Sequence, residues 1–129
     1  MPRTAFYGTV MTGGRDHGLL AGATRVSSTS TAPVYRLWTN QGRYPLLQRD
    51  EAAGGAIRCE VWDVPDDVYA RIHAGEPPGL VPGVVELVDG TEVAAFVADP
   101  AFVASTPLLD VTEHGGFLAY LAQSEKQSG

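Results

Sequence analysis

A glycine-rich stretch near the N-terminus is the first candidate for chemistry. Residues 5–10, Ala-Phe-Tyr-Gly-Thr-Val, lead from an apolar run into a loop at residues 8–14 that holds three glycines, two threonines and no charge. Glycine has no Cβ to keep a ligand from the backbone, so successive N–H groups of such a loop can converge on a carboxylate. A helix predicted at residues 15–21 would direct its positive N-terminal end at the same place. The spacing alone favours a simpler alternative, a strand that ends in an ordinary glycine turn.

Glu76 is the second candidate. It follows the predicted end of a helix and precedes Pro77 and Pro78, which stiffen the loop and fix its direction. The negative end of a helix dipole disfavours ionisation and raises a carboxyl pKa, which suits a general base that later returns its proton. On local features alone, a solvated surface glutamate is the simpler interpretation. Both candidates therefore need support from elsewhere in the chain.

Other kinds of chemistry have weaker signals. His17, His73 and His114 lie far apart in the sequence, and none has the i,i+4 spacing to a histidine or cysteine that a metal site would use. No serine sits in a nucleophile elbow, and neither a P-loop nor a dinucleotide fingerprint occurs. Cys59 is the only cysteine, and it falls on the apolar face of a predicted strand, which indicates a buried structural thiol. We expect neither a metal nor a cofactor.

Length and charge limit the class of protein. The 129 residues predict one domain over residues 1–124, followed by a frayed tail at 125–129. The formal net charge of -6 argues against a nucleic-acid partner and against an anionic membrane surface. No secretory signal or membrane-length apolar run occurs, so we expect a cytoplasmic protein. The expected partner is a small molecule with a carboxylate, and a homodimer is left open.

Apolar periodicity and turn residues predict an α+β fold. Strands are predicted at residues 4–10, 34–38 and 56–63, an extended segment at 25–31, an edge strand at 44–47, and a hairpin at 84–88 and 92–98 around Asp89-Gly90. Helices are predicted at residues 65–74, after Asp99, and from Thr112 to the C-terminus. These elements predict a mixed or antiparallel sheet, curled or closed into a small β-barrel, with short helices at its edges.

Several short motifs follow one another in a recognisable order. They are Tyr7-Gly8-Thr9-Val10, Tyr-Arg-Leu-Trp at residues 35–38, Tyr-Pro-Leu-Leu at 44–47, Gly-Ala-Ile-Arg-Cys-Glu-Val-Trp at 55–62, and Glu76 after a helix. This ordered set resembles the γ-glutamylcyclotransferase-like superfamily over nearly the whole chain. Residues 76–87 and 115–121 look closer to the branch that includes the C-terminal domain of allophanate hydrolase and free-standing relatives.

The resemblance implies a specific reaction. In the superfamily's enzymes the glycine loop holds the α-carboxylate of a γ-glutamyl group, and the glutamate deprotonates its α-ammonium. The amine then attacks the γ-carbonyl, 5-oxoproline closes, and the glutamate protonates the departing amine. The matching positions are Tyr7, Gly8, Thr9 and Val10 for substrate binding and Glu76 for acid–base catalysis. The alternatives are an allophanate-branch enzyme acting on another small carboxylated amide, or a non-catalytic domain that binds a small molecule.

Overall fold

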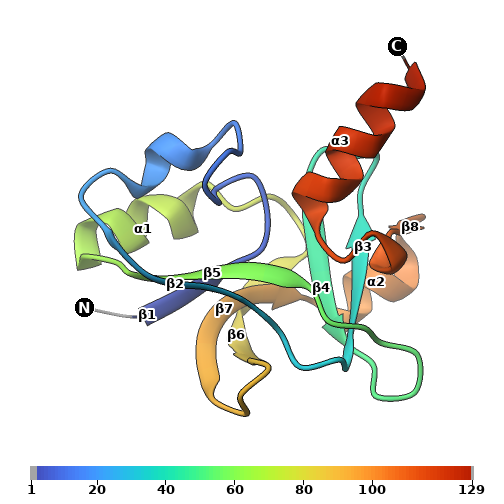
Figure 1. Ribbon diagram of the computed structural model, residues 1–129, viewed down its shortest axis with the longest axis horizontal. Helices are drawn as coiled ribbons and strands as arrows, with labels where there is room; N and C mark the ends of the chain where they lie inside the picture. The colour runs from blue at the N-terminus through green and yellow to red at the C-terminus, as the bar shows by residue number, and fades with distance from the viewer. Residues whose placement is uncertain (1–2, 129) are drawn as a thin grey trace.

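The computed structural model describes residues 3–128, with side chains described up to residue 124. It has an α+β fold with two sheets (Figure 1). The strands are β1 (Arg3–Phe6), β2 (Thr24–Ser30), β3 (Tyr35–Thr39), β4 (Pro45–Arg49), β5 (Arg58–Asp63), β6 (Leu80–Glu86), β7 (Glu92–Ala98) and β8 (Leu109–Asp110). The helices are α1 (Asp66–Ala74), α2 (Pro100–Ser105) and α3 (Phe117–Ser128), with 3-10 turns η1 (His17–Leu20) and η2 (Thr112–His114).

The larger sheet is mixed and has five strands in the order β2-β5-β1-β7-β6. Its central strand, β1, pairs antiparallel with β5 and parallel with β7. The β6–β7 hairpin is confirmed, with Glu86 opposite Glu92 at its closed end. Gly90 in the connecting turn has φ +90°, a conformation that glycine adopts without strain. Because β1 lies in the middle, the loop that leaves its C-terminal end starts at the centre of the fold.

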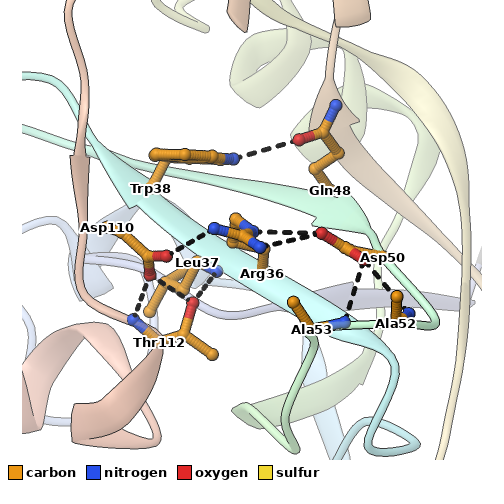
Figure 2. A network of polar contacts seen from close by, with 9 residues as sticks. All are labelled: Arg36, Leu37, Trp38, Gln48, Asp50, Ala52, Ala53, Asp110 and Thr112. Carbon is orange, nitrogen blue, oxygen red and sulfur yellow. Dashed lines mark hydrogen bonds and ion pairs between the residues drawn. The ribbon is translucent and has the colours of Figure 1, made fainter.

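The smaller sheet has the order β4-β3-β8, so β4 is at an edge, as the proline in it predicts. A polar network on β3 holds its neighbours together (Figure 2). Arg36 donates to the carboxylates of Asp50, at 3.0 Å, and Asp110, at 2.8 Å. Its guanidinium also lies over the ring of Trp38, 5.3 Å from the centroid. The cation therefore joins the end of β4 to β8 through β3.

Apolar side chains cover both faces of the larger sheet. One cluster fills the space toward the smaller sheet and α3, and includes Cys59 and Val61 of β5. The other packs Trp62 of β5 and Phe6 of β1 against α1 and η1. The face with Cys59 is predicted correctly, and the thiol is buried. On the opposite face of β5, Glu60 and Trp62 are buried as well, because α1 and η1 cover this part of the sheet.

Local signals predict the helix boundaries well in two places. The first helix runs from Asp66 to Ala74, with Pro65 as its N-cap and Gly75 as its C-cap. In α2 the side chain of Asp99 accepts a hydrogen bond from the N–H of Ala101, which confirms the predicted cap. Figure 1 shows α1 beside η1 on one side of the larger sheet, and α3 rising from the other side.

Other predicted elements differ from the structure. The first strand ends at Phe6, so residues 7–10 belong to the loop. The helix predicted at 15–21 is the four-residue 3-10 turn η1, too short for a significant dipole. The C-terminal helix is divided into η2 and α3, since Gly115 has φ +72° and interrupts the right-handed turn. The backbone of α3 runs to Ser128, and Gly129 lies outside the described residues, so the single domain over residues 1–124 and the frayed tail at 125–129 stay predictions.

The predicted barrel is wrong. In the larger sheet β2 forms a ladder with β5 and β6 with β7. The two edge strands meet only beyond their ends, at an isolated antiparallel bridge between Thr31 and Leu87, and one bridge does not close the sheet into a barrel. Residues 35–49 form a separate sheet with β8 instead of extending the first one. The α+β class and the mixed sheet are confirmed. Among the described residues, no helix has the length and apolar character needed to cross a bilayer.

Candidate functional site

A cavity of about 370 Å³ opens beside the C-terminal end of β1. Both sequence-predicted candidates, the start of the glycine loop and Glu76, are on its wall. Its polar or loop residues include Tyr7, Gly8, Thr9, Val10, Arg15, Asp16, Arg43, Tyr44, Arg71, Glu76 and Pro77. Phe6, Leu19, Ile72, Leu80 and Phe96 supply apolar surface. A partly apolar hollow with a few charged groups is typical of a small-molecule site.

Tyr7 supports the site instead of offering a free hydroxyl. Its hydroxyl donates to the carbonyl of Phe96 at 2.6 Å and accepts from the N–H of Leu47 at 3.2 Å. It thus joins the end of β1 to β7 and β4, and the side chain is buried. Burial, and to a lesser extent the charge of Glu76, raise the pKa of Tyr7 well above its ordinary value. The phenol is therefore neutral at physiological pH.

The glycine loop has fewer available N–H groups than predicted. The N–H of Met11 donates to the carbonyl of Gly8 at 3.1 Å, so it is used within the loop. Among the described backbone and the side chains up to residue 124, the N–H groups of Gly8, Thr9 and Val10 have no hydrogen-bond acceptor. These three residues also line the cavity. The loop can therefore offer a ligand donors at residues 8–10.

Close backbone approach explains two of the loop's glycines. A Cβ on Gly8 would lie 2.9 Å from Cγ of Pro45, and a Cβ on Gly14 would overlap the carbonyl oxygen of Thr9. Thr9 also bonds Asp16 twice, through its hydroxyl at 2.6 Å and its carbonyl at 3.0 Å. The glycine content thus lets the loop fold back on itself and against β4.

Glu76 directly follows the C-cap of α1, and its N–H donates to the carbonyl of His73 at 3.2 Å. Burial raises the pKa of its carboxyl group to about 7. The sequence predicts a raised carboxyl pKa from the dipole of the helix end, whereas in the structure the pKa is raised by desolvation. No hydrogen bond or ion pair holds this carboxylate among the residues that the structure describes. It is a partly buried acid that can take up or release a proton near neutral pH.

Arginines on the cavity wall are functional candidates that sequence reasoning missed. Arg15 donates to the carbonyl of Arg43 at 2.6 Å and lies 3.7 Å from Asp16. Among the side chains of residues 3–124 and the described backbone, the guanidinium groups of Arg43 and Arg71 have neither a hydrogen-bond nor an ion-pair partner. These arginines come from the loop after β1, the turn before β4 and helix α1, so no local motif connects them.

The remaining sequence candidates lie elsewhere. His17 contacts the carbonyl of Val10 through Nδ1 at 3.0 Å, His73 packs on Phe96, and His114 packs on Tyr120. In the described part of the chain, no group of three or more histidine, cysteine or acidic residues could hold a metal ion. Burial raises the pKa of Cys59 to about 11, which is the expected behaviour of an inert structural thiol.

Comparison with known proteins shows the family of the chain. The profile described as the allophanate hydrolase C-terminal domain matches residues 3–122. The chain belongs to this family. It is 27% identical over 110 residues to the urea amidolyase of Saccharomyces cerevisiae, covering 81% of this chain but 6% of that protein. The chain therefore spans a small fraction of the curated relative that it matches.

Solved structures of other proteins share the fold. The c4763 protein of uropathogenic Escherichia coli superimposes with a TM-score of 0.84 at 29% identity, covering 94% of this chain and 95% of that one. The allophanate hydrolase of Kluyveromyces lactis gives 0.83 at 29% identity, with 95% of this chain matched to 21% of that chain.

A more distant likeness concerns the fold alone. An AIG2-like protein from mouse superimposes with a TM-score of 0.58 at 19% identity, covering 84% of this chain and 86% of that one. The predicted resemblance to the γ-glutamylcyclotransferase-like superfamily is thus confirmed at the level of fold, and the allophanate hydrolase branch is confirmed as the family.

Proposed function

We propose that the cavity binds a small carboxylated amide of the allophanate type, and that Glu76 exchanges a proton with its amide group. The proposal rests on one observation: a carboxyl group with a pKa near 7 and two unpaired guanidinium groups share a cavity wall. At neutral pH both protonation states of Glu76 are populated, which is the condition for general acid–base catalysis. A ligand held by its carboxylate at the arginines can place its amide against Glu76.

Each side chain then has a distinct role. The guanidinium groups of Arg43 and Arg71 form charge-assisted hydrogen bonds to the ligand carboxylate, a pairing for which the planar fork of arginine is suited. The N–H groups of Gly8, Thr9 and Val10 add neutral donors. Tyr7 holds the loop in place, and Glu76 moves the proton. Phe96, on the cavity wall, adds an apolar surface and no polar contact.

The allophanate branch has more support than the cyclisation that the superfamily resemblance implies. Sequence similarity extends over 3–122 to the allophanate hydrolase C-terminal domain, and the named relatives include a urea amidolyase and an allophanate hydrolase. The likeness to the AIG2-like protein is a likeness of fold. Closure of a γ-glutamyl amide to 5-oxoproline therefore becomes the second hypothesis, to be separated by its product.

Product analysis tests the proposal directly. The purified protein is incubated with allophanate and, separately, with a panel of γ-glutamyl amides, and ammonia, carbon dioxide and 5-oxoproline are measured. We expect turnover of allophanate, reduced by roughly 10²–10⁴-fold in Glu76→Gln, because glutamine keeps the shape but cannot accept a proton. Asp66→Asn and Asp67→Asn, at exposed positions of α1, are matched controls that should turn over like the wild type.

The other outcomes each select a different hypothesis. Release of 5-oxoproline from a γ-glutamyl amide, with allophanate untouched, would replace the proposal by cyclisation. Binding of carboxylated amides without turnover of any of them would select the non-catalytic domain. Wild-type turnover in Glu76→Gln would remove Glu76 from the mechanism.

A further inference from the structure

Glu60 is a buried charged group that the proposed mechanism does not use. It lies on β5, only 5% exposed, in a strand whose other side chains at 59, 61 and 62 are apolar. Burial raises the pKa of its carboxyl group, but hydrogen bonds from Thr12 and Trp62 and the charge of Arg25 outweigh burial, so the pKa is lowered overall. The group is therefore an anion, and its position needs a reason.

One oxygen of Glu60 receives all of its short contacts. Oε1 accepts from the N–H of Thr12 at 2.8 Å, from the hydroxyl of Thr12 at 3.1 Å and from the indole N–H of Trp62 at 3.2 Å. Arg25 lies 3.7 Å from the other oxygen. A backbone N–H bonded to a carboxylate makes a stronger contact than a neutral pair. The carboxylate thus attaches the glycine loop to the sheet at Thr12.

Two other bonds join the loop region to neighbouring segments: Arg15 donates to the carbonyl of Arg43, and Arg25 of β2 donates to the hydroxyl of Thr12 at 3.5 Å. The remaining bonds act within the loop. The turn from Gly8 to Met11, the Thr9–Asp16 contacts and the bond between His17 and the carbonyl of Val10 fix its internal shape. They do not set where that shape sits on β5. The bonds of Glu60 do so, two residues beyond the cavity-lining segment 8–10.

We propose that Glu60 is a positioning residue, which acts through Thr12 to hold the N–H groups of residues 8–10 at the cavity. The inference rests on the proposed function, because it presumes that these groups contact the ligand. It makes a distinctive prediction for the conservative variant. Since the three donors share one oxygen, Glu60→Gln retains an acceptor for all of them, whereas Glu60→Ala removes it.

Two readouts test the inference in the whole chain. Amide hydrogen exchange at residues 8–16 reports loop position without any ligand. Calorimetric binding of N-carbamoylglycine, a stable carboxylated amide, reports the site. We expect Glu60→Ala to weaken binding by about 10-fold or more, as for lost hydrogen bonds to a charge, and to speed exchange at Thr12. Glu60→Gln should stay within about 3-fold of the wild type in both readouts, because its hydrogen bonds are kept.

Trp62→Phe is the matched control. It removes the third donor to the same oxygen, leaves both bonds from Thr12 in place and keeps an aromatic ring against His17. A merely structural role for Glu60 would therefore affect both variants alike. A positioning role predicts near wild-type affinity in Trp62→Phe despite lower stability. If Glu60→Ala does not fold, Glu60→Met replaces it, because methionine fills a similar volume without offering the N–H of Thr12 a carboxylate acceptor, and weaker binding with faster loop exchange is again the supporting result.

Failure of the inference can be told apart from failure of the proposed function. If the wild type does not bind N-carbamoylglycine, the proposed function fails, and the exchange experiment still tests Glu60. If a folded Glu60→Ala, or Glu60→Met in its place, shows wild-type exchange at residues 8–16 and undiminished binding, the positioning role is overturned.

Discussion

The hydroxyl of Tyr44 donates a 2.7 Å hydrogen bond to the carbonyl of Pro78, two residues after Glu76. The same hydroxyl accepts from the side-chain amide of Asn40 at 3.1 Å. On the other side of this turn, Arg15 donates to the carbonyl of Arg43. The turn at residues 40–44 therefore joins the glycine loop to the loop that carries Glu76, and both lie on the cavity wall.

We expect Tyr44→Phe to loosen the Glu76 loop. The variant loses the hydrogen bond to the carbonyl of Pro78 and the one from the side chain of Asn40. The net contribution of each such bond to the free energy of unfolding is about 0.5–1.5 kcal/mol. Hydrogen exchange at residues 76 and 79, which flank the two prolines, should become faster. Turnover should decrease although the free energy of unfolding changes only by the contribution of these two bonds. Exchange by mass spectrometry and urea denaturation measure the two effects.

Tyr69→Phe is the control for this prediction. Tyr69 stacks on Phe96, with ring centroids 5.5 Å apart, and its hydroxyl has no hydrogen bond among the described residues. Its removal should leave exchange in the Glu76 loop unchanged. Equal effects of the two substitutions would show that the hydroxyl of Tyr44 does not restrain that loop.

Glu76 should make the folded protein less stable at alkaline pH. Its carboxyl pKa rises from the ordinary 4.5 to about 7 on folding, because burial disfavours the anion. The folded state then binds more protons than the unfolded state between these values, so stability decreases as pH rises from about 4.5 to about 7. Glu76→Gln lacks this titration and should be relatively more stable above pH 7.

The size of this effect has an upper limit. Each unit of pKa shift corresponds to about 1.4 kcal/mol of free energy of unfolding, and partial exposure of the carboxyl group reduces this value. We therefore expect ionisation of Glu76 to destabilise the folded protein by about 1–3 kcal/mol at pH 8. Urea denaturation of both proteins between pH 4.5 and 8 measures it. A difference between the two proteins that stays constant over this range would mean that Glu76 is ionised normally in the folded state.

Local signals account for the elements that the sequence predicts correctly. The two ends of α1 are marked by Pro65 with the acidic residues after it and by Gly75. The turn between β6 and β7 is marked by Asp89-Gly90. Both patterns depend on neighbours in the chain. The position of Glu76 follows from the same boundary, since Glu76 is the first residue after Gly75, the C-cap of α1.

Tertiary pairing decides what the sequence could not show. The predicted barrel fails because β3 pairs with β8, a strand of two residues that is too short to leave a periodic pattern. The desolvation of Glu76 likewise depends on packing and not on the adjacent helix end. Arg15, Arg43 and Arg71 reach one cavity from three separate segments, so their proximity exists only in the folded chain.

Alanine substitutions at two glycines should have opposite effects. A Cβ on Gly14 overlaps the carbonyl of Thr9, so Gly14→Ala forces the loop apart and should cost about 1–3 kcal/mol. Gly18, in η1, has nothing within 4 Å of an added Cβ and no positive φ. Gly18→Ala should stabilise by about 0.4–1 kcal/mol, through a less flexible unfolded chain. Chemical denaturation distinguishes the two, and equal stabilities would contradict the tight loop geometry.

Arg43 and Arg71 should govern affinity for the charged end of the ligand. Arg43→Gln and Arg71→Gln should each weaken binding of N-carbamoylglycine by about 10-fold, because each removes charge-assisted hydrogen bonds. The neutral N-carbamoylglycinamide should bind wild type and variants alike. Arg3→Gln is a matched control, since Arg3 pairs with Asp63 and is absent from the cavity wall.

Calorimetry at two ionic strengths adds a second criterion, as salt screens an exposed guanidinium–carboxylate pair. Undiminished, salt-independent binding in both variants would assign the carboxylate to the backbone N–H groups of residues 8–10 instead.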